Sequence, residues 1–64
     1  MIELRLPDMS CGHCVQVVTK TVQRIDALAK VDVELEQRRV RIESSREPRE
    51  FEAALAEAGY PAAH

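Results

Sequence analysis

The sequence predicts an α+β fold in which two helices cover one face of an antiparallel sheet. Two observations predict it. Apolar and charged residues alternate in three short segments, and apolar residues recur every three or four positions in two longer ones. The segments follow in the order strand, helix, strand, strand, helix. With 64 residues, the chain is predicted to form a single domain over residues 1–64, near the smallest size that sustains a hydrophobic core.

The first strand is predicted over residues 2–6, where apolar and charged side chains alternate. Pro7 ends this strand, because proline has no N–H to donate to a β-ladder. An amphipathic helix is predicted from about residue 12 to residue 26, since valine and isoleucine recur there at helical spacing. Ser10 is expected to cap its first turn.

A β-hairpin is predicted next, because alternation with a period of two returns over residues 31–36 and residues 39–43. Its turn is placed near Gln37 and Arg38, although the usual Asn-Gly or Asp-Gly pair is missing. Acidic side chains on the first of these strands face basic ones on the second. Ion pairs between the two strands are therefore expected.

The second helix is predicted to begin near Pro48, a residue that suits a first helical turn. Its buried stripe comprises Phe51, Ala54, Leu55 and Ala58. Gly59 stands where a left-handed residue ends a helix, and the tail after it is short. The architecture is therefore a ferredoxin-like βαββα(β) sandwich with a last strand that is short or absent. Six core residues are expected: Val18, Val22, Ile25, Val33, Phe51 and Leu55.

The composition excludes several classes of function. The net charge is −2, whereas nucleic-acid binders usually carry a basic patch on a basic domain. No apolar run reaches transmembrane length, so no insertion into a membrane is expected, and the charged N-terminus is unlike a signal peptide. A cytoplasmic location is expected, where thiols stay reduced. The chain runs from Met1 to residue 64 and is expected to be free-standing rather than part of a larger transporter.

The segment MSCGHC, residues 9–14, holds both cysteines. Cys11 lies in the loop after the first strand, and Cys14 lies in the first turn of the first helix. The partial positive charge of a helix N-terminus favours thiolate over thiol. If the two sulfurs share one metal ion, they are expected to lie about 4–5 Å apart. The pair can serve a redox site, a zinc site or a two-thiolate site for a soft metal.

The redox interpretation has support, because protein disulfide isomerases also carry Gly-His between their cysteines. Thioredoxin-like domains, however, usually have about 80–110 residues. They also have a tryptophan before the first cysteine, where this chain has Ser10, and a cis-proline loop beside the disulfide. The downstream prolines here are Pro48, at a helix start, and Pro61, in the tail. A small thiol–disulfide oxidoreductase remains the alternative function.

A structural zinc site is disfavoured, because it needs four ligands. Besides the two cysteines, the chain offers His13 and the terminal His64. Two thiolates without further ligands suit a soft cation, above all Cu(I), with Hg(II) as a mimic. A reducing cytoplasm also favours Cu(I). The residues alone therefore predict a protein that binds a soft metal.

The stretch from Met9 to Cys14 matches the M-x-C-x-x-C signature of heavy-metal-associated domains. The match continues through the valines of the first helix, the hairpin strands and the segment Ala58-Gly59-Tyr60. The chain resembles bacterial copper chaperones of the CopZ/Atx1-like type. This resemblance implies a non-enzymatic protein that holds Cu(I) with Cys11 and Cys14. It also implies transfer of the copper to the metal-binding domain of a P-type copper-transporting ATPase.

The chain departs from the family pattern at Asp8, where glycine is common, at Ala29-Lys30, where Gly-Val is usual, and at its short C-terminus. Four residues are expected around the metal without being its main ligands: Met9, Ser10, His13 and Tyr60. Met9 is expected to pack beneath the loop and His13 to point to solvent. The protein is expected to be a monomer, or a dimer bridged by the metal.

Overall fold

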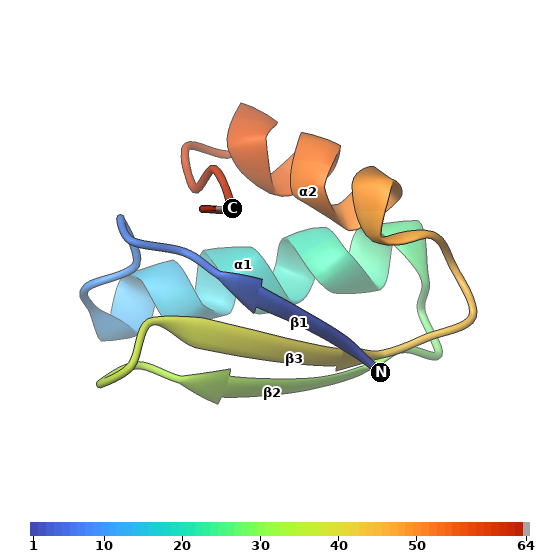
Figure 1. The fold of residues 1–64 in the computed structure, drawn as a ribbon, viewed down its shortest axis with the longest axis horizontal. Coiled ribbons are helices and arrows are strands. Elements are labelled where there is room, and N and C mark those ends of the chain that lie inside the picture. The colour runs from blue at the N-terminus through green and yellow to red at the C-terminus, as the bar shows by residue number, and fades with distance from the viewer. Residues whose placement is uncertain (64) are drawn as a thin grey trace.

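A computed structural model describes residues 1–63. The elements are β1 (Ile2–Arg5), α1 (Gly12–Ile25), β2 (Lys30–Glu34), β3 (Arg39–Glu43) and α2 (Pro48–Glu57). The strands form one antiparallel sheet in the order β1-β3-β2 (Figure 1). Each predicted element is present, and its bounds differ from the predicted ones by at most two residues.

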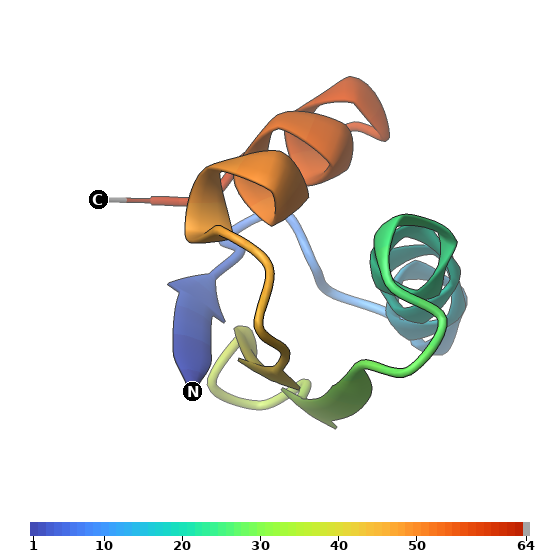
Figure 2. The same cartoon turned by 90° about the vertical axis from the view of Figure 1, so that its right-hand side faces the viewer.

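The helices and the sheet form two layers. Viewed along the helices, α1 and α2 lie on the same side of the sheet, as predicted (Figure 2). This arrangement confirms the ferredoxin-like fold. Its reason lies in the strands, whose even-numbered residues in β1 and β3 are apolar and turn to the helices while the odd-numbered ones are charged. No helix within the described residues is long and apolar enough to span a membrane.

The core is aliphatic apart from one aromatic ring. The largest side chains that are wholly buried are Phe51, Leu6, Met9, Ile42, Leu55, Val18, Val22 and Val40. Four of the six predicted core residues are therefore fully buried. The other two, Ile25 and Val33, are only partly buried and pack against the edge of this cluster.

The charged face of the sheet is arranged differently from the prediction. The register does place Asp32 opposite Arg41 and Glu34 opposite Arg39, as expected. The ion pairs of the two arginines, however, run to Glu3 on β1, with Nε–O distances of 3.4 Å for Arg39 and 3.5 Å for Arg41. Because β3 is the middle strand, its arginines have acidic neighbours on both sides, and the partner on β1 is the one within reach.

The tail after α2 returns to the edge of the sheet. The Ala63 N–H donates to the Arg5 carbonyl over 2.8 Å, and this single bridge stands where a last strand would pair with β1. The prediction that the last strand is short or absent is thereby confirmed. His64, named above as a possible further zinc ligand, lies outside the described residues.

Candidate metal centre

Three segments meet at one end of the molecule: the β1–α1 loop (residues 6–11), the turn between β2 and β3, and the turn that follows α2 (Figure 1). The two helices run in opposite directions, so the N-terminus of α1 and the C-terminus of α2 share this end. The sequence places both cysteines and Tyr60 here.

Two buried residues, Leu6 and Met9, anchor the β1–α1 loop. Leu6 and Met9 are fully buried, whereas Pro7 and Asp8 between them are exposed. The Met9 N–H donates to the Leu6 carbonyl over 3.0 Å and closes a tight turn. Met9 thus packs in the core, as its expected role beneath the loop requires.

The start of α1 differs from the prediction. Cys11 is the N-cap residue, with an extended backbone (φ −148°, ψ 165°), and the cap has no side-chain hydrogen bond. The expectation that Ser10 caps the helix is wrong, because α1 begins one residue too late for Ser10 to hold the N-cap position. The first-turn N–H groups therefore have no side-chain cap, and they lie beside the two thiols.

Both cysteines are free, and they differ in exposure. Cys11 is exposed, while Cys14 is 7% exposed and belongs to the core cluster. Their sulfur atoms lie 2.8 Å apart. This separation exceeds the S–S bond of a disulfide, about 2.05 Å. It is also shorter than the separation predicted for a shared metal ion, so the sulfurs must move apart before an ion enters between them.

The surroundings of Cys14 favour its thiolate. Its pKa is lowered from 9.0 to about 7, first by the hydrogen bond with the Cys11 thiol and then by one with the Tyr60 hydroxyl. Backbone hydrogen bonds of Ser10 and Cys11 act in the same direction, while burial opposes them. The pKa of Tyr60 is correspondingly raised, chiefly by its hydrogen bond to Cys14. Tyr60 therefore stays protonated and remains able to donate to a thiolate.

A glycine-dependent turn brings Tyr60 to the thiols. Gly59 has φ +97°, and its N–H donates to the Ala56 carbonyl over 3.1 Å. The Tyr60 N–H donates to the Leu55 carbonyl over 2.8 Å. These two bonds define a Schellman motif, and the left-handed backbone predicted at Gly59 is confirmed. Half-buried Tyr60 then packs on the core with its hydroxyl toward Cys14.

The two remaining candidate residues are neighbours of the cysteines in the chain, and the backbone of Ser10 is hydrogen-bonded to Cys14. His13 and Ser10 are exposed. Within the described part of the chain, no three His, Cys, Asp or Glu side chains come together as a metal-binding group. The arrangement provides two soft sulfur donors, one on an exposed loop end and one fixed in a helix.

One residue that reaches the β1–α1 loop was not predicted from the sequence. Arg38, in the turn between β2 and β3, donates from Nη1 to the Pro7 carbonyl over 3.0 Å. The sequence held one signal for it, because the predicted turn lacked the glycine or asparagine that such turns usually contain.

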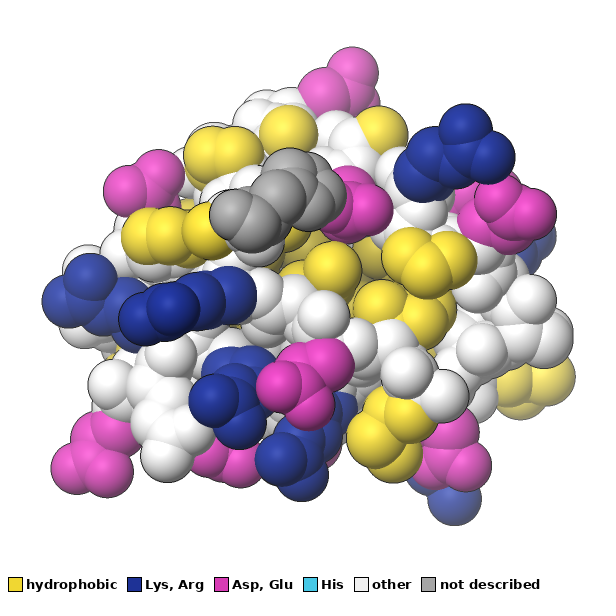
Figure 3. All heavy atoms as spheres, in the orientation of Figure 1, with side chains coloured by type: hydrophobic (Ala, Val, Ile, Leu, Met, Phe, Trp, Pro, Cys, Tyr) yellow, Lys and Arg dark blue, Asp and Glu magenta, His cyan; other side chains and the backbone are white. Residues whose placement is uncertain are grey.

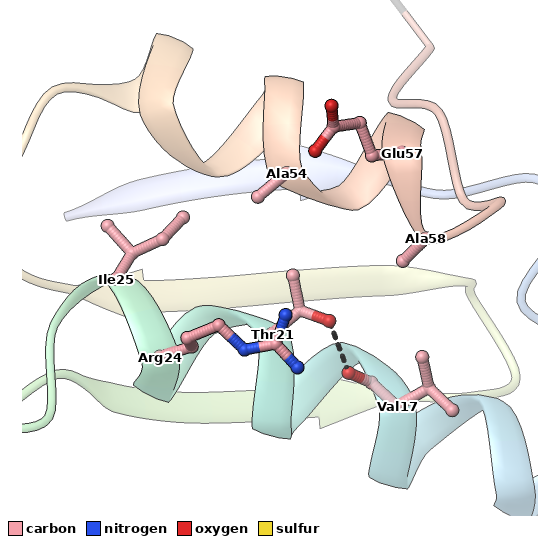
Figure 4. A pocket seen from close by; sticks show the side chains of 7 residues that line it. All are labelled: Val17, Thr21, Arg24, Ile25, Ala54, Glu57 and Ala58. Carbon is pink, nitrogen blue, oxygen red and sulfur yellow. Dashed lines mark hydrogen bonds between the residues drawn. The ribbon is translucent and has the colours of Figure 1, made fainter.

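A separate hollow lies between the two helices (Figure 4). Its volume is about 340 Å³, and its lining residues are Val17, Thr21, Arg24, Ile25, Ala54, Glu57 and Ala58. The Thr21 hydroxyl donates to the Val17 carbonyl over 2.7 Å, so this polar group is satisfied within α1. None of the predicted site residues lines the hollow.

Comparison with protein families identifies the fold and the motif together. The model of the heavy-metal-associated domain matches residues 3–61. The chain belongs to the heavy-metal-associated domain family. A search among curated proteins returned no match.

Solved structures agree with this membership in the heavy-metal-associated domain family. The copper chaperone Atx1 from Synechocystis PCC6803, in the Cu1, trimeric form of a His-to-Tyr mutant, has a TM-score of 0.95 at 38% identity, covering 98% of this chain and 100% of that one. A gold binding protein has a TM-score of 0.93 at 35% identity, with coverages of 97% and 95%. Oxidized MerP from Ralstonia metallidurans CH34 has a TM-score of 0.82 at 31% identity, with coverages of 97% and 90%.

Proposed function

We propose that this protein, as a single domain over residues 1–64, binds Cu(I) through Cys11 and Cys14 and carries it to another protein. The observation that supports this proposal most strongly is the pair of free thiols, 2.8 Å apart at the N-terminus of α1. Low coordination by two thiolates suits soft cations, and the lowered pKa of Cys14 supplies one thiolate near neutral pH. The copper is cargo, so the protein acts as a carrier and not as an enzyme.

The choice of metal draws support from the similar structures. One of them is a copper chaperone and another a gold binding protein. Copper and gold in their monovalent states are soft and accept two sulfur ligands, as Hg(II) does in vitro. Zinc fits less well, because a closed zinc site takes four ligands. We infer that Cu(I) is the physiological cargo and that the protein acts in a reducing cytoplasm.

Release is proposed to follow ligand exchange. A thiolate of the acceptor forms a bond to the copper, which is then held by three sulfurs, before the bond to Cys11 breaks. Cys11 is the sulfur expected to leave first, because it is exposed at the loop end, whereas buried Cys14 is fixed within α1. The acceptor is proposed to be the C-x-x-C of a metal-binding domain in a P-type copper ATPase. The carrier is proposed to be monomeric, or bridged into a dimer by the metal.

One observation favours a second function. Two thiols 2.8 Å apart, one with a pKa near 7, are also suited to thiol–disulfide exchange. The described chain, however, has no cis peptide bond, so it lacks the cis-proline loop that thioredoxin-like enzymes place beside their disulfide. The insulin-reduction assay decides between the two functions. Turnover close to that of thioredoxin would favour the oxidoreductase.

Copper titration under anaerobic, reducing conditions tests the proposal directly. In competition with a strong Cu(I) chelator, the protein is expected to take up one equivalent of Cu(I). The matched control is the double variant Cys11→Ser/Cys14→Ser, which replaces each sulfur with oxygen at nearly the same volume. If the double variant competes as well as the unmodified protein, the two cysteines are not the ligands and the proposal fails.

A further inference from the structure

The turn between β2 and β3 is hydrogen-bonded to the base of the β1–α1 loop. The Leu6 N–H donates to the Arg38 carbonyl over 2.8 Å, and Arg38 Nη1 donates to the Pro7 carbonyl over 3.0 Å. The side-chain bond joins residues 31 positions apart in the sequence. Figure 1 shows this turn and the loop at the same end of the molecule.

The backbone of Arg38 is unusual. Its φ is +55°, and no other residue except glycine has a positive φ within the described chain. In this region an arginine is less stable than glycine or asparagine would be. The turn itself needs only the backbone of this residue, whose N–H donates to the Leu35 carbonyl over 3.1 Å. The side-chain bond to Pro7 is what an arginine adds at this position.

The charges around Arg38 leave its guanidinium available for Pro7. Arg5, Glu36, Gln37, Arg38 and Arg39 line a shallow, polar hollow of about 460 Å³. Figure 3 shows basic side chains gathered at the left of the molecule, the end at which Figure 1 shows the turn between β2 and β3. Arg39 is paired with Glu3, and Arg5 lies opposite Arg39 in the register. Arg38 has no ion pair among residues 1–63, so the Pro7 carbonyl is the partner that its side chain has there.

The bond to Pro7 acts on the part of the loop that leads to Cys11. The same loop is closed by the bond from Met9 to Leu6, and Met9 is buried. Opening the thiol pair from 2.8 Å requires Cys11 to move, because Cys14 is held within α1. We propose that Arg38 is a positioning residue that latches the β1–α1 loop and limits the movement of Cys11 away from Cys14. Through this latch Arg38 regulates the entry and exit of copper, and that part of the inference rests on the proposed function.

Substitution at Arg38 tests the latch in the metal-free protein. Arg38→Asn accepts the left-handed backbone but is too short to reach Pro7. We expect hydrogen exchange of the Met9 amide and alkylation of Cys11 to accelerate by roughly threefold to tenfold, the effect of losing one hydrogen bond. Arg38→Gly should give the same result, and Arg38→Lys, which keeps a donor, should restore part of the protection.

Two controls separate positioning from charge and from general stability. Arg5→Gln removes a positive charge from the same hollow without touching Pro7, and it should leave both rates unchanged. The thermal stability of Arg38→Asn should equal or exceed that of the unmodified protein, because backbone strain is relieved. A merely structural role for Arg38 would instead lower global stability together with loop protection.

The latch and the proposed function can be refuted separately, because loop mobility and copper binding are measured in different experiments. Unchanged Met9 exchange in Arg38→Asn and Arg38→Gly, or equal acceleration in Arg5→Gln, overturns the latch even when copper binds normally. Conversely, accelerated exchange in a protein that fails to bind Cu(I) supports the latch and refutes the proposed function. If both proposals hold, copper transfer from Arg38→Asn to an acceptor thiol pair should be faster than from the unmodified protein.

Discussion

Two helix ends flank the thiols, and they are built in opposite ways. At the C-terminus of α2, Gly59 and Tyr60 satisfy the last carbonyls through a Schellman motif. At the N-terminus of α1, Cys11 occupies the cap position without a side-chain hydrogen bond. One end is closed by backbone bonds, whereas the other is left open.

The two helix ends therefore have different roles at the site. The closed end fixes the position of Tyr60, which donates to Cys14 and favours its thiolate. The open end leaves N–H groups and a partial positive charge beside two sulfurs. A better cap on α1 would satisfy those N–H groups with an oxygen in place of a thiol. We therefore expect the uncapped first turn of α1 to be less stable than a capped one, while its N–H groups remain available to the thiolates. Four predictions test this.

The largest effect is expected from removing either sulfur at the open end. Cys11→Ser and Cys14→Ser should each lose tight Cu(I) binding, because oxygen is a poor ligand for a soft cation. Chelator competition under reducing conditions measures the loss. Tyr60→Phe is the control, since it alters the closed end and keeps both thiols. Tight binding by either single variant would mean that one cysteine suffices and that the pair is not the site.

A second prediction compares a glycine from each end. An added Cβ would meet no atom within 4 Å at Gly12 or at Gly59, so any effect comes from the backbone. Gly59 has φ +97°, and Gly59→Ala should lower the free energy of unfolding by about 1–2 kcal/mol. Gly12 begins α1 with negative φ, and Gly12→Ala should be neutral or raise it by up to about 1 kcal/mol. Denaturant unfolding of both variants is the measurement. Equal effects would show that the closed end is no more constrained than the open one.

The accuracy of the sequence predictions follows the same division. Pro48 and Gly59 were placed correctly because their roles depend on neighbours within one helical turn. The cap of α1 was missed by one residue, since Ser10 and Cys11 both precede the helix and serine is the residue type that N-caps favour. Local signals therefore located the closed end better than the open one.

Contacts between distant segments were beyond local signals. The bond from Arg38 to Pro7 depends on how the hairpin packs against the β1–α1 loop. The ion pairs of Glu3 depend on β3 lying between the other two strands, and the charge pattern of the hairpin also fits pairing within the hairpin. The predicted sulfur separation of about 4–5 Å was conditional on a shared metal ion, so the distance of 2.8 Å between the two free thiols does not test it.

A third prediction concerns the link between the two ends. Tyr60→Phe removes a donor to Cys14, and the pKa of Cys14 should rise from about 7 toward 9.0. The rise should be smaller than that caused by Cys11→Ala, since the bond with Cys11 is the larger cause of the lowered pKa. Loss of a group that stabilises the thiolate shifts the titration to higher pH, so less thiolate is present at neutral pH. The ultraviolet absorbance of the thiolate, followed against pH in the metal-free protein, measures the shift. An unchanged titration would show that Tyr60, at the closed end, does not affect the pKa of Cys14 at the open end.

The smallest expected effect is the stability that a side-chain cap at position 11 adds to α1. Serine is a preferred N-cap residue, and the extended backbone of Cys11 is the conformation in which its hydroxyl reaches the N–H groups of the first turn. In the metal-free protein, Cys11→Ser should therefore be more stable to unfolding than Cys11→Ala by about 0.5–1 kcal/mol. The alanine variant is the matched reference, because both substitutions remove the sulfur and only serine can cap. Denaturant unfolding resolves the difference if the two variants share the same m-value. Equal stabilities would show that the first turn of α1 gains nothing from a cap, and that the open end has no stability cost. A clear advantage for serine would show that a side-chain oxygen at position 11 caps α1 and stabilises its first turn.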